Sequence, residues 1–175
     1  MTAHDIHVTA DPHVPHHGTL RCGDLEFPCI IGKAGVTADK REGDHRTPLG
    51  TYPLRRLHYR PDVYGAPPET GLPARAIAPQ DGWCDDPAHP DYNRPVTLPF
   101  AASHERLWRD DRVYDLVVEI GYNDAPPAPG RGSAIFLHLA RPDGTGTEGC
   151  VALAEPHLRK VLAKLGPGSR ITIAG

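Results

Sequence analysis

Cys150 is the residue of this chain whose surroundings best suit nucleophilic chemistry. It ends the segment Thr147-Glu148-Gly149-Cys150, which follows a glycine-rich turn and comes just before an expected helix. A thiol acts as a nucleophile when a nearby base or positive charge favours its thiolate, and N–H groups that face the reacting carbonyl stabilise the oxyanion. Gly149 permits close approach of a substrate, and the backbone N–H groups of Gly149 and Cys150 are the expected oxyanion donors.

His138 is the candidate base for this thiol. It lies twelve residues before Cys150, at the end of a strand-like segment, and the turn at 141–146 can fold the chain back so that the two side chains meet. The spacing leaves a second interpretation open. Most cysteines are not catalytic, so Cys150 is explained equally well as a buried structural thiol beside a histidine that is satisfied within its own strand.

Composition excludes several classes of function. The chain has 175 residues and a formal net charge of −3, with lysines and arginines spread along it, so no basic stripe is present for nucleic acid. No apolar run approaches the roughly 20 residues of a membrane span, and the polar N-terminal stretch contains no visible signal peptide. We therefore expect neither nucleic-acid binding nor membrane insertion.

Neither a disulfide scaffold nor a metal centre is indicated. The four cysteines are few and scattered, so we expect free thiols. Three histidines near the N-terminus, at positions 13, 16 and 17, have no cysteine or carboxylate at the local spacing of a zinc site. The sequence therefore predicts no metal and no cofactor.

Short strands dominate the expected secondary structure. Strand-compatible residues separated by proline, glycine and aspartate indicate a meander in the N-terminal half, and two apolar segments further on indicate central strands. The expected strands cover residues 6–9, 19–22, 25–31, 51–59, 114–122, 133–139 and 170–173.

Two helices are expected. Leucine and valine residues at 158, 161, 162 and 165 follow helical spacing, Pro156 suits the first turn, and Gly166 suits the C-terminal cap. A short helix is expected over 103–108, with Ser103 as its N-cap. The predicted fold class is mostly β, with one short helix near the middle and one helix after Cys150.

Prolines are dense over residues 59–114, and an idle connection is seldom this long. Trp83 and Arg94 in this stretch suit a substrate cleft, where an arginine pairs with a carboxylate, or else a loop held by its own hydrogen bonds. Tyr122 and Asn123, at the end of a predicted strand, either support the site or act as turn residues.

Two separated motifs give the chain a resemblance to a known family. A histidine on a strand, a variable turn and then Ser or Thr, any residue, Gly and Cys occur here as His138 and segment 147–150. The stretch 40–52, KREGDHRTPLGTY, contains a segment similar to G-D-x-x-T-P-x-G-x-Y. Over roughly residues 19–173 the chain thereby resembles the L,D-transpeptidase catalytic domain, also called the YkuD-like domain.

The resemblance implies a β-sandwich or barrel with long proline-rich loops. It implies an N-terminal segment and first strand over 1–18, followed by a catalytic domain over 19–175 with a loop insertion at about 60–112. It also implies peptidoglycan stem peptides as partners and carbapenems as acylating inhibitors.

The implied activity is peptidoglycan L,D-transpeptidation. Cys150 attacks the carbonyl of the third residue of a stem tetrapeptide with His138 as base, the terminal D-Ala leaves, and an amine of a second stem takes the acyl group. One alternative is an L,D-carboxypeptidase that hydrolyses muropeptides in wall recycling, and another is a non-catalytic peptidoglycan-binding module. The substrate indicates the cell envelope or periplasm, whereas the lack of a visible signal peptide leaves the cytoplasm open.

One departure from the family concerns substrate contacts. Many members have an arginine two residues after the cysteine, where this chain has Ala152. Either Arg141 or Arg94 replaces its contribution to substrate or loop positioning, or that contribution is absent from this chain. The expected substrate-binding residues are Thr147, Trp83, Arg94, Arg141, Tyr122 and Asn123.

Overall fold

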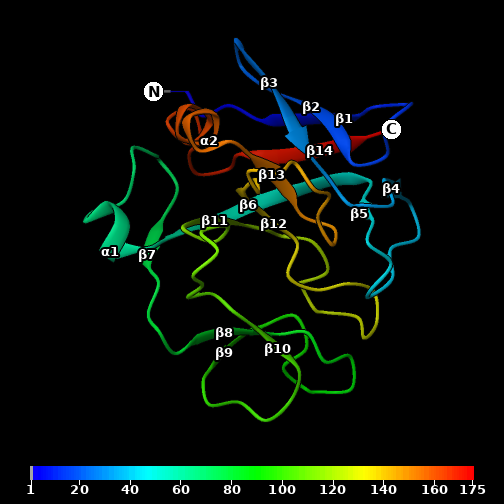
Figure 1. The fold of residues 1–175 in the computed structure, drawn as a ribbon, viewed down its shortest axis with the longest axis vertical. Helices are drawn as coiled ribbons and strands as arrows, with labels where there is room; N and C mark the ends of the chain where they lie inside the picture. Colours follow the sequence, from blue (N-terminus) through cyan, green and yellow to red (C-terminus); the bar gives the residue numbers. More distant parts are fainter. Residues whose placement is uncertain (1) are drawn as a thin grey trace.

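A computed structural model describes residues 2–175, in which short strands form most of the regular structure (Figure 1). The helices are α1 (Pro61–Tyr64) and α2 (Glu155–Leu162). The expectation of a mostly β fold is confirmed. The strands are β1 (Ile6–Ala10), β2 (His17–Cys22), β3 (Leu25–Ile30), β4 (Val36–Thr37), β5 (Thr47–Pro48), β6 (Gly50–Tyr59), β7 (Ala74–Ala76), β8 (Asp81–Cys84), β9 (Pro95–Thr97), β10 (His104–Arg106), β11 (Leu116–Ile120), β12 (Phe136–Leu139), β13 (Val151–Leu153) and β14 (Arg170–Ala174).

The large sheet closes on itself. Its strand order is β11-β12-β13-β3-β2-β1-β14-β6-β7, and β6 pairs in addition with β11. The first part of β6, from Gly50 to Pro53, pairs with β14, and the later part, from Leu54 to Tyr59, pairs with β11. One long strand thus joins both ends of the sheet and makes it a barrel.

Alternation of apolar and polar residues directs one face of the barrel strands inward. In β1, Ile6 and Val8 are buried while His7 and Thr9 are exposed, as a half-buried strand requires. Helix α2 adds Leu158, Val161 and Leu162 to the same core. The barrel interior is therefore filled by side chains, and any ligand site must lie outside it.

The helix expected after Cys150 is confirmed as α2, with one correction at its end. Pro156 lies in the first turn as predicted. The prediction that Gly166 caps the helix is wrong, because Ala163 occupies the C-cap position with right-handed backbone. The N–H of Gly166 donates instead to Ser169 Oγ in the turn toward β14. Neither helix among residues 2–175 has the length and apolarity to cross a membrane.

The proline-rich stretch after β6 holds a second sheet, in which β8 lies between β10 and β9. Figure 1 shows this sheet at the end of the molecule away from α2 and both termini. The prediction of a short helix over 103–108 is wrong, because β10 occupies part of this segment and pairs with β8. Pairing with β8 therefore decides the backbone conformation of this segment. The short helix of this region is α1, which begins at Pro61.

Two predicted strands are shorter than expected. Only Leu116–Ile120 of the segment 114–122 and only Phe136–Leu139 of the segment 133–139 pair in the sheet. Ala134 has a φ of 52°, in the left-handed region, so the strand cannot begin before it. The other predicted strands are confirmed to within one or two residues of their ends.

Candidate active site

Cys150 and His138 line one cavity of about 410 Å³. His138 lies on β12, and β13 begins directly after Cys150, so a strand rather than a helix follows the cysteine. The two strands run parallel, with His138 opposite Ala152. The barrel therefore brings together the two residues that the sequence marks as nucleophile and base.

Cys150 is only 7% exposed, and its side chain rests against the start of β12. Its Sγ donates to the carbonyl oxygen of Ala134 at 3.2 Å and accepts the N–H of Phe136 at 3.4 Å. Burial first and the nearby Glu105 carboxylate second raise the pKa of the Cys150 thiol to about 12. In the free protein the sulfur is therefore a thiol.

The His138 ring is oriented by a backbone contact. Nδ1 lies 2.8 Å from the carbonyl oxygen of Leu139, which can only accept, so the proton is on Nδ1 and Nε2 is left as an acceptor. Burial lowers the pKa of His138 to about 4. No hydrogen bond joins this ring to Cys150 in the described chain. The two groups form a neutral pair, in which the thiol proton must leave during attack.

The turn before the thiol is fastened by Thr147. Its hydroxyl donates to the carbonyl oxygen of Cys150 at 2.6 Å, and its Oγ1 accepts the N–H of Gly149 at 3.1 Å. The expected oxyanion donors therefore differ in availability. The N–H of Gly149 is already bound to Thr147, whereas that of Cys150 donates to no group among residues 2–175.

The turn requires glycine at position 149, because its φ angle is positive and there is no room for a Cβ atom. Its φ is 142°, and an added Cβ would lie 2.8 Å from the carbonyl oxygen of Arg46. A side chain at this position would displace the loop that contains the upstream motif. The glycine thus positions the thiol rather than only leaving room for a substrate.

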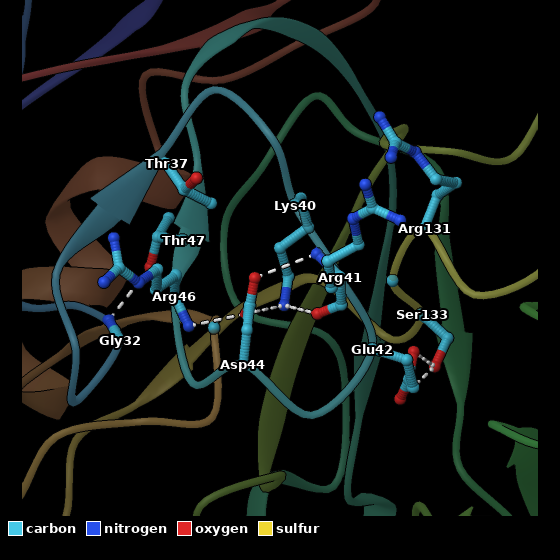
Figure 2. A network of polar contacts seen from close by, with 12 residues as sticks. Gly32, Thr37, Lys40, Arg41, Glu42, Asp44, Arg46, Thr47, Arg131 and Ser133 are labelled. Carbon is cyan, nitrogen blue, oxygen red and sulfur yellow. Dashed lines mark hydrogen bonds and ion pairs between the residues drawn. The ribbon is translucent and has the colours of Figure 1, made fainter.

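The loop at 38–47 forms one wall of the cavity. Its buried Lys40 donates from Nζ to Asp44, and Asp44 also accepts the backbone N–H of Arg46 (Figure 2). The Lys40 side chain passes close to the turn, since a Cβ at Gly149 would lie 3.5 Å from its Cε. The positive charge of Lys40 is therefore balanced by Asp44.

Glu42 joins the same loop to the chain that precedes β12. It accepts from Ser133 Oγ at 2.9 Å and from the Tyr92 hydroxyl at 2.6 Å. Figure 2 shows the Glu42 and Ser133 side chains facing each other. Ser133 directly precedes Ala134, whose carbonyl accepts from the thiol, so this contact helps to fix the position of the sulfur.

The proline-rich stretch supplies another wall, which includes Glu105 and Tyr114. The Tyr114 hydroxyl donates to Glu105 at 2.6 Å, and the Tyr114 ring lies edge-on to His138 with centroids 5.3 Å apart. Burial raises the pKa of Glu105 to about 7, while the hydrogen bond from Tyr114 lowers it. Sequence reasoning missed Glu105, because a lone glutamate in a predicted helix carries no signal.

Trp83 and Arg94 do not line the cavity that contains Cys150. Both line a neighbouring cavity of about 390 Å³. Trp83 is buried against Phe136, with ring centroids 5.1 Å apart, and donates from Nε1 to Asn93 at 2.9 Å. Trp83 therefore packs behind the thiol, and Arg94 lies on the other side of this packing.

Of the remaining predicted substrate-binding residues, two line the cavity and two lie in a turn outside it. Arg141 and Thr147 line the cavity, and Arg141 lies 3.3 Å from Asp111 in an ion pair. Asn123 has a φ of 50° and bonds through its side chain to the backbone at 128 and 132. Tyr122 donates its hydroxyl to the carbonyl of Arg131. Tyr122 and Asn123 shape a turn and do not line the cavity.

The other cysteines, Cys22, Cys29 and Cys84, are buried free thiols outside this cavity, as the sequence predicts for free cysteines. Within residues 2–175, no three histidine, cysteine or acidic side chains converge as metal ligands.

Replacement of Asn93 by alanine is expected to lower the free energy of unfolding by about 3 kcal/mol. The buried Asn93 side chain accepts from Trp83 and from the N–H of Ala134, donates to two backbone carbonyls, and has a φ of 56°. Urea unfolding measures the change, with the exposed Asp110→Ala as control. A loss below about 0.5 kcal/mol would show that this network is dispensable.

A family model describes almost the whole chain. The model of the L,D-transpeptidase catalytic domain, YkuD, matches residues 19–173. A search of curated proteins gave no match.

Solved structures that match the chain include Pgp2, a helical cell shape determining protein from Campylobacter jejuni, with 16% identity, a TM-score of 0.47, and coverage of 98% of this chain and 48% of that chain. L,D-transpeptidase 1 from Mycobacterium tuberculosis has 12% identity and a TM-score of 0.41, with coverage of 98% and 62%. An L,D-transpeptidase from Mycobacterium smegmatis has 13% identity and a TM-score of 0.41, with coverage of 98% and 59%. The chain thus spans less than two thirds of each of these proteins.

Proposed function

Because the chain belongs to the L,D-transpeptidase catalytic domain family, we propose that it is a cysteine-dependent peptidoglycan L,D-transpeptidase. The observation that carries this proposal is the shared cavity of Cys150 and His138, in which the imidazole has a free acceptor nitrogen. The substrate class and the site of action in the cell envelope are inferred from the family.

The first half-reaction forms a thioester. Cys150 Sγ attacks the carbonyl carbon of the third residue of a stem tetrapeptide while the thiol proton passes to His138 Nε2. The free N–H of Cys150 is the donor available to the resulting oxyanion. The C–N bond then breaks, and the departing D-Ala amine takes the proton from His138.

The second half-reaction releases the acyl group. An amine of a second stem attacks the thioester carbon, a C–N bond forms, the C–S bond breaks, and the sulfur recovers a proton through His138. Water in place of the amine would give a carboxypeptidase, and a module without catalysis would give no thioester. The products therefore separate the three functions.

Incubation with a purified disaccharide-tetrapeptide, followed by mass spectrometry, tests the proposal. Cross-linked dimers together with free D-Ala are the expected products. Tripeptide alone would assign the chain as a carboxypeptidase. Bound but unchanged tetrapeptide, with no adduct on Cys150, would make it a binding module.

A carbapenem is expected to add its mass once to the wild-type protein. Acylation needs the same attack by Cys150 on a carbonyl carbon, so a Cys150→Ala variant should gain no mass. Intact-protein mass spectrometry measures the adduct, and Cys29→Ala, which removes a buried thiol outside the cavity, is the matched control. An adduct that persists in Cys150→Ala would place the reactive group elsewhere.

A further inference from the structure

Carboxylates without counterions line the cavity around the thiol. Glu42, Asp85, Glu105 and Glu148 all line it, and none of them forms an ion pair within residues 2–175, although Glu42 accepts two hydroxyl groups. One oxygen of Asp85 is buried and has no hydrogen-bond partner in that range. Glu105 accepts only the hydroxyl of Tyr114. These carboxylates place negative charge beside the reaction centre without a direct ion pair.

Three of the four cations that line the same cavity are engaged in ion pairs. Lys40 is paired with Asp44, and Arg109 and Arg141 share Asp111. The exposed Lys33 contributes to the rim. Of the lining cations, Lys33 alone has no ion-pair partner among residues 2–175, so a positively charged ligand would meet more unpaired carboxylates than unpaired cations in this cavity.

Glu105 acts against the formation of a thiolate. After burial, its carboxylate is the largest influence that raises the pKa of Cys150. A carboxylate that opposes the nucleophile is unfavourable in the first half-reaction. Its place in the cavity is explained if it serves the second half-reaction, in which the thiol is the leaving group and a positively charged amine must enter.

We propose that Glu105 binds the ammonium group of the acceptor stem and removes one proton from it, so that the thioester is transferred to an amine in preference to water. This inference rests on the proposed transpeptidase function. It makes Glu105 the specificity-determining residue for the acceptor, while His138 serves the thiol.

The proton balance of this step is complete. The ammonium gives one proton to the Glu105 carboxylate and becomes a neutral amine, which attacks the thioester carbon. The second proton of the amine passes to His138 Nε2 and then to the sulfur as the C–S bond breaks. The products are the amide, the Cys150 thiol and a protonated Glu105, which returns its proton to solvent.

The groups around Glu105 set the pH at which it can act. Tyr114 and Arg109 favour the carboxylate, whereas burial and the charges of Asp85 and Glu148 favour the protonated form. Neutral His138 and the Cys150 thiol line the same cavity, as do the charged residues Glu42, Lys33, Lys40 and Arg141. With a pKa of about 7, Glu105 is ionised above neutrality, so transfer should decline as the pH falls below about 7.

The test compares wild type with Glu105→Gln, in which the amide oxygen still accepts from Tyr114. The thioester is formed from disaccharide-tetrapeptide, and its partition between dimer and tripeptide is measured from pH 5 to 9. We expect the dimer-to-tripeptide ratio to fall by about 10²-fold and to lose its decline below neutrality. The exposed Glu69→Gln is the matched control.

A second nucleophile separates this role from a structural one. Hydroxylamine is uncharged at neutral pH, so its reaction with the thioester should be equal in wild type and Glu105→Gln. In Tyr114→Phe the lost hydrogen bond raises the pKa of Glu105, so the decline of dimer formation should move to higher pH.

The outcomes distinguish failure of the two proposals. A dimer-to-tripeptide ratio that is unchanged in Glu105→Gln overturns the role of Glu105 and leaves the transpeptidase intact. An equal loss with hydroxylamine and with the stem amine also overturns it, because the defect would then not concern the charge of the acceptor. A wild type that forms no thioester contradicts the proposed function itself.

Discussion

Replacement of Cys150 by alanine lowers turnover of a disaccharide-tetrapeptide to the uncatalysed background, a loss of roughly 10⁶-fold. Without the sulfur no thioester forms, and no other thiol lines the cavity among residues 2–175. Product formation and the mass of the acyl adduct are the measurements. Activity retained in the alanine variant would remove Cys150 from the mechanism.

The same variant should remain folded with a small loss of stability. Cys150 is buried in an apolar cluster, and its thiol donates to the carbonyl of Ala134, so alanine leaves that carbonyl without its partner. We expect the free energy of unfolding to fall by about 1 kcal/mol. Cys150→Ser keeps a hydroxyl donor and should lie closer to wild type in stability while being equally inactive. This comparison separates chemistry from packing.

Replacement of His138 by glutamine is expected to slow thioester formation by about 10²–10⁴-fold. Nε2 of the neutral imidazole is the acceptor for the thiol proton, and an amide is too weak a base to replace it. Single-turnover formation of the acyl adduct measures the rate, with the exposed His7→Gln as control. A variant that acylates as fast as wild type would exclude His138 as the base.

The pH dependence gives a second measurement for the same variant. Because burial lowers the pKa of His138 to about 4, the wild-type rate of thioester formation should fall only as the pH drops through that value and the ring becomes protonated. This acid limb should disappear in His138→Gln. Alkylation of Cys150 by iodoacetamide, followed across the same range, reports whether the imidazole assists the thiol directly. Superimposable alkylation profiles would contradict the pairing.

The parts of the fold that were predictable are those with local periodicity. Alternation in β1 and helical spacing in α2 follow from which side chains face the core, so the residues themselves indicate the element. Segment 103–108 has neither pattern. Its backbone is decided by pairing with β8, a contact that no local feature of the sequence describes.

The candidate site was predictable only where chemistry and spacing coincide. Cys150 and His138 stand out by residue type beside turns, and the structure places them in one cavity. The hydrogen bond that the Gly149 N–H donates to Thr147 was not predictable, because it depends on the rotamer of Thr147. Glu105 lies far from Cys150 in the sequence and comes close to the thiol only when the chain folds. Its effect on the pKa of Cys150 could therefore not be predicted from the sequence.

The apolar cluster behind the thiol has a consequence for local stability. Trp83 of the second sheet, Phe136 of the barrel and Cys150 itself belong to this one cluster. Opening of the second sheet would expose that cluster to water, so the sheet cannot detach without disturbing the barrel wall on which the sulfur rests. The two sheets therefore share one cooperative unit, in which amide hydrogens of β8 and β12 exchange through the same opening event.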